Sequence, residues 1–260
     1  MTGIPVLELA DVRKSFDAVA AVAGVSLRIG AGRVYALIGP NGAGKTTLLN
    51  VISGHVGRDG GSIRLRGRPI DDWPASRRVL QGMARTFQIT QLFGRMTALE
   101  NVLCGFHPHV RQSWPAVLLG LRSFAAEERR LRADAAALLE SLGMTDYADV
   151  PARTLPFGLQ RRLEVARALA TRPSLLLLDE PCAGLSGPES ADLGGLLRRL
   201  AAEGMCVLVV EHNMPFVQEV ADEVVVLDAG EVIASGDPAR VRDDPRVIEA
   251  YLGGIENGAA

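Results

Sequence analysis

The segment from Gly39 to Thr47, which reads Gly-Pro-Asn-Gly-Ala-Gly-Lys-Thr-Thr, limits the possible folds of this chain more than any other feature. It matches the pattern G-x-x-x-x-G-K-[ST] and directly follows the apolar run Val34–Ile38, so the pattern stands in its required strand-to-helix context. Glycines let the backbone curl so that successive N–H groups point inward, and the following helix adds the positive end of its dipole. A Gly-rich surface turn would need neither the lysine nor the strand. The segment therefore predicts a loop that binds the phosphates of a nucleotide.

Each residue of this loop is a candidate ligand of the nucleotide. Lys45 is expected to reach the β- and γ-phosphates, and the hydroxyl of Thr46 is expected to bind Mg²⁺. A nucleoside triphosphate and Mg²⁺ are therefore the predicted cofactors, and the family resemblance given below implies that the nucleotide is ATP. The predicted contacts of the phosphates are Gly39, Pro40, Asn41, Gly42, Ala43, Gly44, Lys45, Thr46 and Thr47.

An acidic pair follows a second apolar run, Leu175–Leu178, at Asp179 and Glu180. A buried strand in an open α/β sheet places such carboxylates at its carboxyl end, where ligands bind. Asp179 is expected to hold Mg²⁺ through its water shell, and Glu180 to polarise the attacking water. Phosphoryl transfer depends mainly on positioning and charge neutralisation, so these two acids suffice. Taken alone, an acidic pair after a strand is as often a helix N-cap.

Two further polar residues end strands of the same predicted sheet. His212 follows the apolar run Cys206–Val210, and a neutral imidazole there could contact the γ-phosphate. Gln88 closes the run Met83–Phe87 and can offer an amide oxygen to Mg²⁺ or to water. Without the phosphate loop, the histidine would be read as structural and the glutamine as an ordinary loop residue.

The alternation of short apolar runs with longer helical patterns predicts an α/β fold in one domain. Residues 1–88 and 155–235 are predicted to form the nucleotide-binding core, and residues 89–154 a helical insertion with a charged helix at 124–142. Residues 236–260 form a polar C-terminal extension that is expected to fray. Helices are expected after Gly44, Gly158 and Pro188. The expected strands are 7–12, 25–29, 34–38, 62–65, 83–87, 175–179, 206–211, 224–227 and 231–234.

Composition narrows the function classes. The formal net charge is −2, which provides no overall positive field for nucleic acid or anionic lipid. The longest apolar runs fall well short of the ~20 residues that cross a bilayer, so a membrane role would require a partner. The arginine pairs are expected to lie on solvated helix faces, because most have carboxylates nearby. These pairs are Arg77/Arg78, Arg129/Arg130, Arg161/Arg162 and Arg198/Arg199.

The order of these motifs resembles the ATPase subunits of ABC transporters along nearly the whole chain. The resemblance adds Phe16 as an aromatic residue that stacks on adenine, and it matches Gln88 to the Q-loop and His212 to the switch histidine. It also places the D-loop at residues 183–186. The implied fold is a P-loop NTPase with a RecA-like core sheet, an antiparallel β subdomain and an inserted α-helical subdomain. The implied activity is ATP hydrolysis with Lys45, Glu180 and His212 as catalytic residues and Thr46, Gln88 and Asp179 as metal-binding residues.

The family's signature segment, typically Leu-Ser-Gly-Gly-Gln, departs from its usual form here. In related ATPases this segment closes on ATP held by the other subunit of a head-to-tail dimer. Pro156 cannot supply the serine hydroxyl, and Ser186 replaces the usual Asp or Asn of the D-loop. Because the phosphate loop, Asp179, Glu180 and His212 are intact, we expect a non-identical partner ATPase that completes this subunit's ATP site. The corresponding residues are Leu155, Pro156, Phe157, Gly158, Leu159 and Gln160.

The segment 155–169 and the C-terminal segment 236–253 are similar to those of branched-chain amino acid importers. In those systems two different ATPases lie beneath two permeases on the cytoplasmic face of the membrane, and an external binding protein selects the substrate. The resemblance thus implies a second ATPase, two permeases and indirectly a binding protein as partners, with no nucleic acid. The run 89–102 could dock a permease helix through its large apolar side chains, although they could equally be core.

Three alternatives remain at this stage. A soluble nucleotide kinase would also use a phosphate loop, but it has no use for the signature, the D-loop or His212. A non-transport ABC ATPase acting on DNA or ribosomes usually carries a coiled coil or two ATPase units, and neither pattern occurs in this sequence. The ATPase of a lipid or lipopolysaccharide exporter is a close relative, against which the C-terminal segment favours an importer.

Overall fold

The computed structural model describes residues 4–86, 91–109 and 122–256, and these residues pack as two compact units. The first unit comprises Met1–Gln88 and Ser174–Ala260, and the second comprises Ile89–Pro173. The helical unit thus extends beyond residue 154, where the sequence interpretation ended the insertion, because the helix at Phe157–Leu169 packs with the helices before it.

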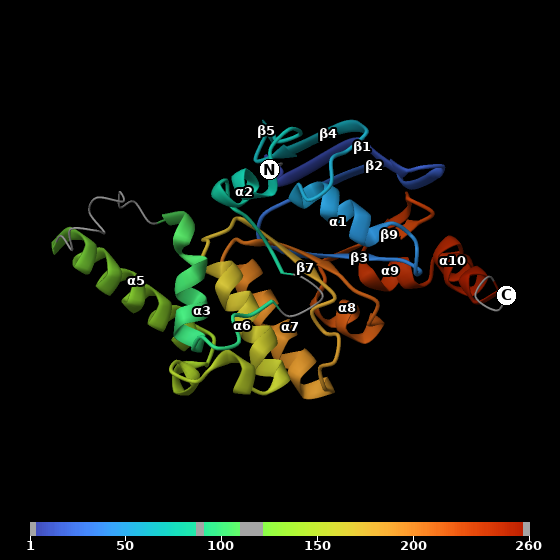
Figure 1. Cartoon of the computed structure of the whole chain (residues 1–260). Coiled ribbons are helices and arrows are strands. Elements are labelled where there is room, and N and C mark those ends of the chain that lie inside the picture. Colours follow the sequence, from blue (N-terminus) through green and yellow to red (C-terminus); the bar gives the residue numbers. More distant parts are fainter. Residues whose placement is uncertain (1–3, 87–90, 110–121, 257–260) are drawn as a thin grey trace. The chain divides into compact units, whose positions relative to one another are not determined.

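Two sheets form the frame of the first unit (Figure 1). In its described residues, one sheet has the order β2-β1-β4-β5 and is antiparallel. The other has the order β10-β9-β3-β8-β7-β6 and is parallel except for β10. The strands are β1 (Leu7–Phe16), β2 (Val19–Ile29), β3 (Arg33–Ile38), β4 (Gly60–Leu65), β5 (Arg68–Pro69), β6 (Met83–Arg85), β7 (Leu175–Asp179), β8 (Cys206–Val210), β9 (Glu223–Asp228) and β10 (Glu231–Gly236).

The larger sheet is buried on both faces, as a parallel sheet requires. One face packs on α1 (Lys45–Ser53) and the antiparallel sheet, with Leu37 of β3 in that core. The other face, with Ile38, packs against the C-terminal helices. The other helices of this unit are α2 (Ala75–Leu80), α7 (Gly187–Ala202), α8 (Met214–Val220), α9 (Pro238–Arg242) and α10 (Pro245–Glu256).

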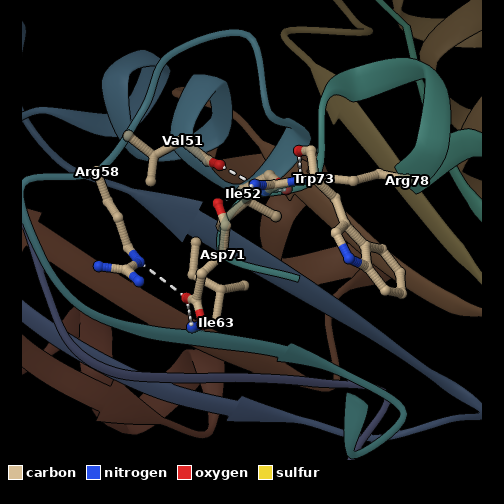
Figure 2. Close-up of polar contacts among 7 residues, drawn as sticks. All are labelled: Val51, Ile52, Arg58, Ile63, Asp71, Trp73 and Arg78. Atoms are coloured by element: carbon tan, nitrogen blue, oxygen red, sulfur yellow. Dashed lines mark hydrogen bonds and ion pairs between the residues drawn. The ribbon is translucent and has the colours of Figure 1, made fainter. Parts of the chain in front are cut away.

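A buried arginine fixes the carboxyl end of α1 (Figure 2). The Arg78 guanidinium donates to the carbonyl oxygens of Val51 and Ile52 at 2.8 and 2.6 Å, and to that of Trp73 at 2.9 Å. The last carbonyls of a helix have no partner within it, so Arg78 supplies their hydrogen bonds and holds the helix that begins at Lys45. The expectation of solvated arginine pairs is wrong for Arg78 and for Arg161, both of which are buried.

The second unit is helical in its described residues, as the sequence predicted. It contains α3 (Ala98–Gly105), α5 (Arg122–Ser141), α6 (Phe157–Leu169) and three short 3-10 turns at residues 107–109, 145–147 and 152–154. Thr97 and Glu100 form a reciprocal capping box that begins α3. In the run before α3, Phe93 is exposed while Leu92 and Met96 are half-buried.

The α/β fold and the antiparallel sheet are confirmed, and a strand is observed at each predicted position, with β1 and β2 longer than predicted. The strand predicted at 83–87 ends at Arg85, and residue 87 lies outside the described residues. The C-terminal extension is not frayed up to residue 256. Its apolar residues Val241, Val247 and Tyr251 pack against the central sheet and so order α9 and α10. Within the residues that the structure describes, we find no helix with the length and hydropathy of a membrane span.

Candidate functional site

The phosphate loop connects β3 to α1 in a backbone form that only glycine accepts at two positions. Gly39 has φ +149° and Gly44 has φ +97°. A Cβ on Gly39 would lie 2.0 Å from the carbonyl oxygen of Leu227, and one on Gly44 would lie 2.1 Å from that of Ala21. Any side chain there would push the loop away from β9 and β2. The loop therefore keeps the tight curl that turns its N–H groups inward.

Lys45 is the first residue of α1, and its ammonium lies across the loop. Its Nζ donates to the carbonyl oxygens of Gly39 at 2.7 Å and Pro40 at 2.9 Å. Burial lowers the pKa of Lys45, whereas the nearby carboxylates of Glu180 and Asp179 act in the opposite direction. The structure thus brings the predicted phosphate-binding lysine and both predicted acids into one electrostatic cluster.

The acidic pair lies at the carboxyl end of β7, as the sequence predicted. Asp179 is the last residue of the strand and is buried, whereas Glu180 is partly exposed. Glu180 has φ +46°, a left-handed conformation that is uncommon outside glycine. Its N–H donates to the Val210 carbonyl oxygen of β8 at 2.9 Å. The structure around Glu180 therefore enforces a strained backbone at the position where the sequence places the catalytic base.

Arg85 is a site residue that the sequence reasoning did not identify. This arginine of β6 donates to the Asp179 carboxylate at 3.0 Å, and to Asn50 Oδ1 and Ser53 Oγ of α1 at 2.7 Å each. Arg85 and Asp179 are both 6% exposed in their side chains. Burial raises the pKa of Asp179, and the Arg85 guanidinium counters that rise. The only sequence signal was its place three residues before Gln88.

We expect Arg85→Met to destabilise the protein by about 3–5 kcal/mol, because it leaves a buried carboxylate without its counter-charge. Chemical denaturation of the nucleotide-free chain measures this loss as a lower midpoint. Arg33→Met is the control, since Arg33 is exposed and its carboxylate partner Glu223 lies 3.7 Å away. Adding Asp179→Asn should restore much of the loss, and no recovery would show that the Arg85–Asp179 pair does not cause it.

His212 lies beside Glu180 because β7 and β8 are parallel neighbours. The register pairs Asp179 with Val210, so the residues that follow these strands leave the same edge of the sheet. The Nδ1 of His212 is 3.9 Å from Oε1 of Glu180, and the imidazole is largely exposed. Glu211, which directly precedes His212, is 1% exposed and was not predicted as a site residue. This edge therefore presents the predicted base and the predicted γ-phosphate contact side by side.

The structure describes the predicted adenine-stacking residue and the signature segment, but it does not describe Gln88. Phe16 is 46% exposed at the end of β1, and the Lys14 ammonium lies 5.3 Å from its ring centre. An exposed ring on a strand neighbouring β2 is available for stacking. Gln88 lies outside the described residues. Pro156 is the N-cap of α6 in the second unit, and Gln160 Nε2 donates to the Leu155 carbonyl oxygen at 2.8 Å.

The donor set suits Mg²⁺ bound mainly through a nucleotide. Thr46 is exposed at the start of α1, and Arg85 donates to Oδ2, one of the two oxygens of the Asp179 carboxylate. A hydroxyl and a carboxylate are the hard oxygen ligands that Mg²⁺ prefers, with phosphates and waters completing the shell. No cluster of three or more His, Cys, Asp or Glu side chains in the described residues could hold a metal by itself.

Comparison with known proteins supports this chemistry. The sequence model of the ABC transporter family matches residues 22–183, and that of the branched-chain amino acid ATP-binding cassette transporter matches residues 231–256. The high-affinity branched-chain amino acid transport ATP-binding protein BraF of Pseudomonas aeruginosa is 42% identical over 96% of this chain and 98% of its own length. The LivG protein of Escherichia coli, described in the same words, is 37% identical over the same shares.

This chain is also similar to a solved structure of an ATP-binding cassette and to the ATPase of an export system. The crystal structure of the ADP conformation of MJ1267, an ATP-binding cassette of an ABC transporter, superposes with a TM-score of 0.84 at 32% identity, covering 96% of this chain and 99% of that one. The lipopolysaccharide export system ATP-binding protein LptB of Haemophilus influenzae is 33% identical over 95% of this chain and 97% of its own length. This chain belongs to the ABC transporter family and is one of its ATP-hydrolysing subunits.

Proposed function

We propose that this chain powers the import of branched-chain or related amino acids. The observation that carries the cargo assignment is the match of residues 231–256 to the branched-chain amino acid transporter model, together with a relative of that class at 42% identity. The matched segment includes α10, whose Val247 and Tyr251 pack on the sheet that carries the phosphate loop. A lipopolysaccharide exporter ATPase is the second candidate, since LptB is 33% identical.

The proposed roles combine the resemblance to ABC ATPases with the geometry of the described site residues. Lys45 and the backbone N–H groups of residues 39 and 41–47 bind the phosphates, and Phe16 stacks on adenine. Thr46, Gln88 and Asp179 hold Mg²⁺, which supplies charge neutralisation when bound. Glu180 orients the attacking water and takes its proton. His212 contacts the γ-phosphate and registers its loss. The supporting geometry is the 3.9 Å approach of Glu180 to His212 beside the buried Asp179.

ATP hydrolysis does work only if the closed pair of ATPases binds ATP more tightly than the open pair. We therefore propose a head-to-tail dimer with a second, non-identical ATPase, beneath two permeases on the cytoplasmic face of the membrane. An external binding protein would select the substrate. Residues 155–160 of this chain would face the partner's ATP, while the partner's signature would complete the ATP site at Lys45.

The signature composition of this chain predicts unequal turnover at the two sites of that dimer. The Ser186 hydroxyl donates to its own helix at Glu189, 2.6 Å away, and Pro156 has no hydroxyl to offer. We expect a complex inactivated only at Lys45 to lose most ATPase activity, and one inactivated only at the partner's loop lysine to keep most of it. The measurement is steady-state phosphate release from both purified complexes. Equal losses would contradict the non-equivalent pair.

Affinity purification of the tagged chain from native membranes tests the function. Co-purification of two permeases, a second ATPase and an amino-acid-binding protein is the expected result, with ATP-dependent uptake of leucine, isoleucine or valine by the reconstituted complex. A variant with Lys45→Ala should assemble equally well and lose uptake, which separates assembly from energy supply. Recovery of lipid-export components would overturn the cargo, and recovery of no membrane protein would overturn the transport role.

A further inference from the structure

A single buried carboxylate connects the two loops that carry Glu180 and His212. Oε1 of Glu211 accepts the N–H of Cys182 at 2.9 Å, two residues beyond Glu180. Oε2 accepts the N–H of His212 at 3.1 Å and that of Asn213 at 3.3 Å. Glu211 is 1% exposed, so solvent does not compete for these bonds.

The backbone of Glu180 needs such support. A non-glycine residue with positive φ is strained, and it persists only where the surrounding structure enforces it. The chain is held on both sides of Glu180, by its own N–H on the Val210 carbonyl oxygen at 2.9 Å and by the N–H of Cys182 on Glu211. Without the second bond, the loop after Glu180 could relax and swing the Glu180 carboxylate away from its position.

We propose that Glu211 is a positioning residue that fixes Glu180 and His212 relative to each other. It acts through backbone N–H groups of both loops, and it holds the Nδ1 of His212 3.9 Å from Oε1 of Glu180. This inference rests on the roles assigned above to Glu180 and His212. A glutamine cannot replace Glu211, because one of its two terminal atoms would be an NH₂ donor facing an N–H donor.

The first test is Glu211→Gln in the complete transporter complex, which keeps the size of the side chain. We expect kcat for ATP hydrolysis to fall about 10–100-fold, as for lost partners that orient site groups, with KM for ATP changed less than about threefold. Glu203→Gln is the matched control, since Glu203 is exposed and loses the same charge. An unchanged kcat in Glu211→Gln would overturn the proposal.

A second readout separates positioning from general stability. Amide hydrogen exchange of the nucleotide-free chain should show lost protection at Cys182, His212 and Asn213, with β7 and β8 still protected. In a background that carries both Glu180→Gln and His212→Ala, Glu211→Gln should lower turnover less than about threefold further, because both groups that Glu211 positions are already removed. A full additional loss in that background would assign Glu211 a merely structural role and overturn the proposal.

The conservative variant covers a folding failure. If Glu211→Gln shows no cooperative unfolding and so fails to fold, Glu211→Asp is tested in its place. Aspartate keeps two acceptor oxygens on a shorter side chain, so we expect its kcat to lie between that of the wild type and that of Glu211→Ala. Wild-type kcat in Glu211→Asp together with lost amide protection would overturn the proposal. A failure of the roles assigned under the proposed function can be told apart from a failure of this inference. If the role of Glu180 is wrong, Glu180→Gln keeps wild-type turnover, whatever effect Glu211→Gln has on amide exchange.

Discussion

Replacing Glu180 by glutamine should leave ATP bound while turnover falls about 10²–10⁴-fold, the usual contribution of a general base. Glutamine keeps the size of the side chain but cannot take a proton from water. The substitution also removes a negative charge near Lys45, so ATP affinity should not decrease. Single-turnover hydrolysis and equilibrium binding of ATP, measured on the same complex, separate the two effects.

Wild-type turnover in Glu180→Gln would contradict this prediction. Glu203→Gln, an equal charge change at an exposed position, should retain wild-type turnover. If Glu180→Gln also retained it, another group would have to orient the water, and the role of Glu180 would be wrong. Because the proposed pair closes on ATP and this variant cannot hydrolyse it, we further expect the Glu180→Gln chain to elute with the proposed partner ATPase as a stable dimer in ATP.

Lys45→Ala should abolish tight ATP binding. The ammonium is the only lysine side chain in the phosphate loop, and truncating one member of a buried charge pair costs about 2–5 kcal/mol, or about thirtyfold or more in Kd. Among the residues that the structure describes, the Lys45 ammonium hydrogen-bonds to two loop carbonyls, at 2.7 and 2.9 Å. The fold should therefore persist. Fluorescent ATP titration measures the affinity, and thermal unfolding checks the fold.

Two controls make the lysine prediction specific. Arg240→Ala removes an exposed positive charge from α9 and should leave the Kd for ATP unchanged. Lys45→Arg keeps the charge but carries a planar, larger group that cannot enter the same loop, so ATP affinity should remain low. Wild-type affinity in Lys45→Ala would mean that the backbone N–H groups bind ATP alone, and the role of Lys45 would be refuted.

The sequence by itself determined the elements that depend on local patterning. The run Val34–Ile38 followed by Gly-x-x-x-x-Gly-Lys-Thr identified β3, the loop and α1, because glycine spacing and the apolar run act within neighbouring residues. Asp179, Glu180 and His212 were predicted in the same way, since each lies within two residues of the end of an apolar run. Their common edge followed from parallel strand order, which the register of Asp179 with Val210 bears out.

Only the tertiary structure decided which charged residues became buried partners. Arg85, Arg78 and Glu211 look like ordinary polar residues in the sequence, and burial depends on contacts with residues 26–94 positions away. The C-terminal helix α10 is likewise ordered because Val247 and Tyr251 pack against an apolar face of the sheet, which the local sequence around them does not indicate. Local chemistry therefore specified the phosphate loop and the acids, whereas long-range packing selected the charged side chains that hold them in place.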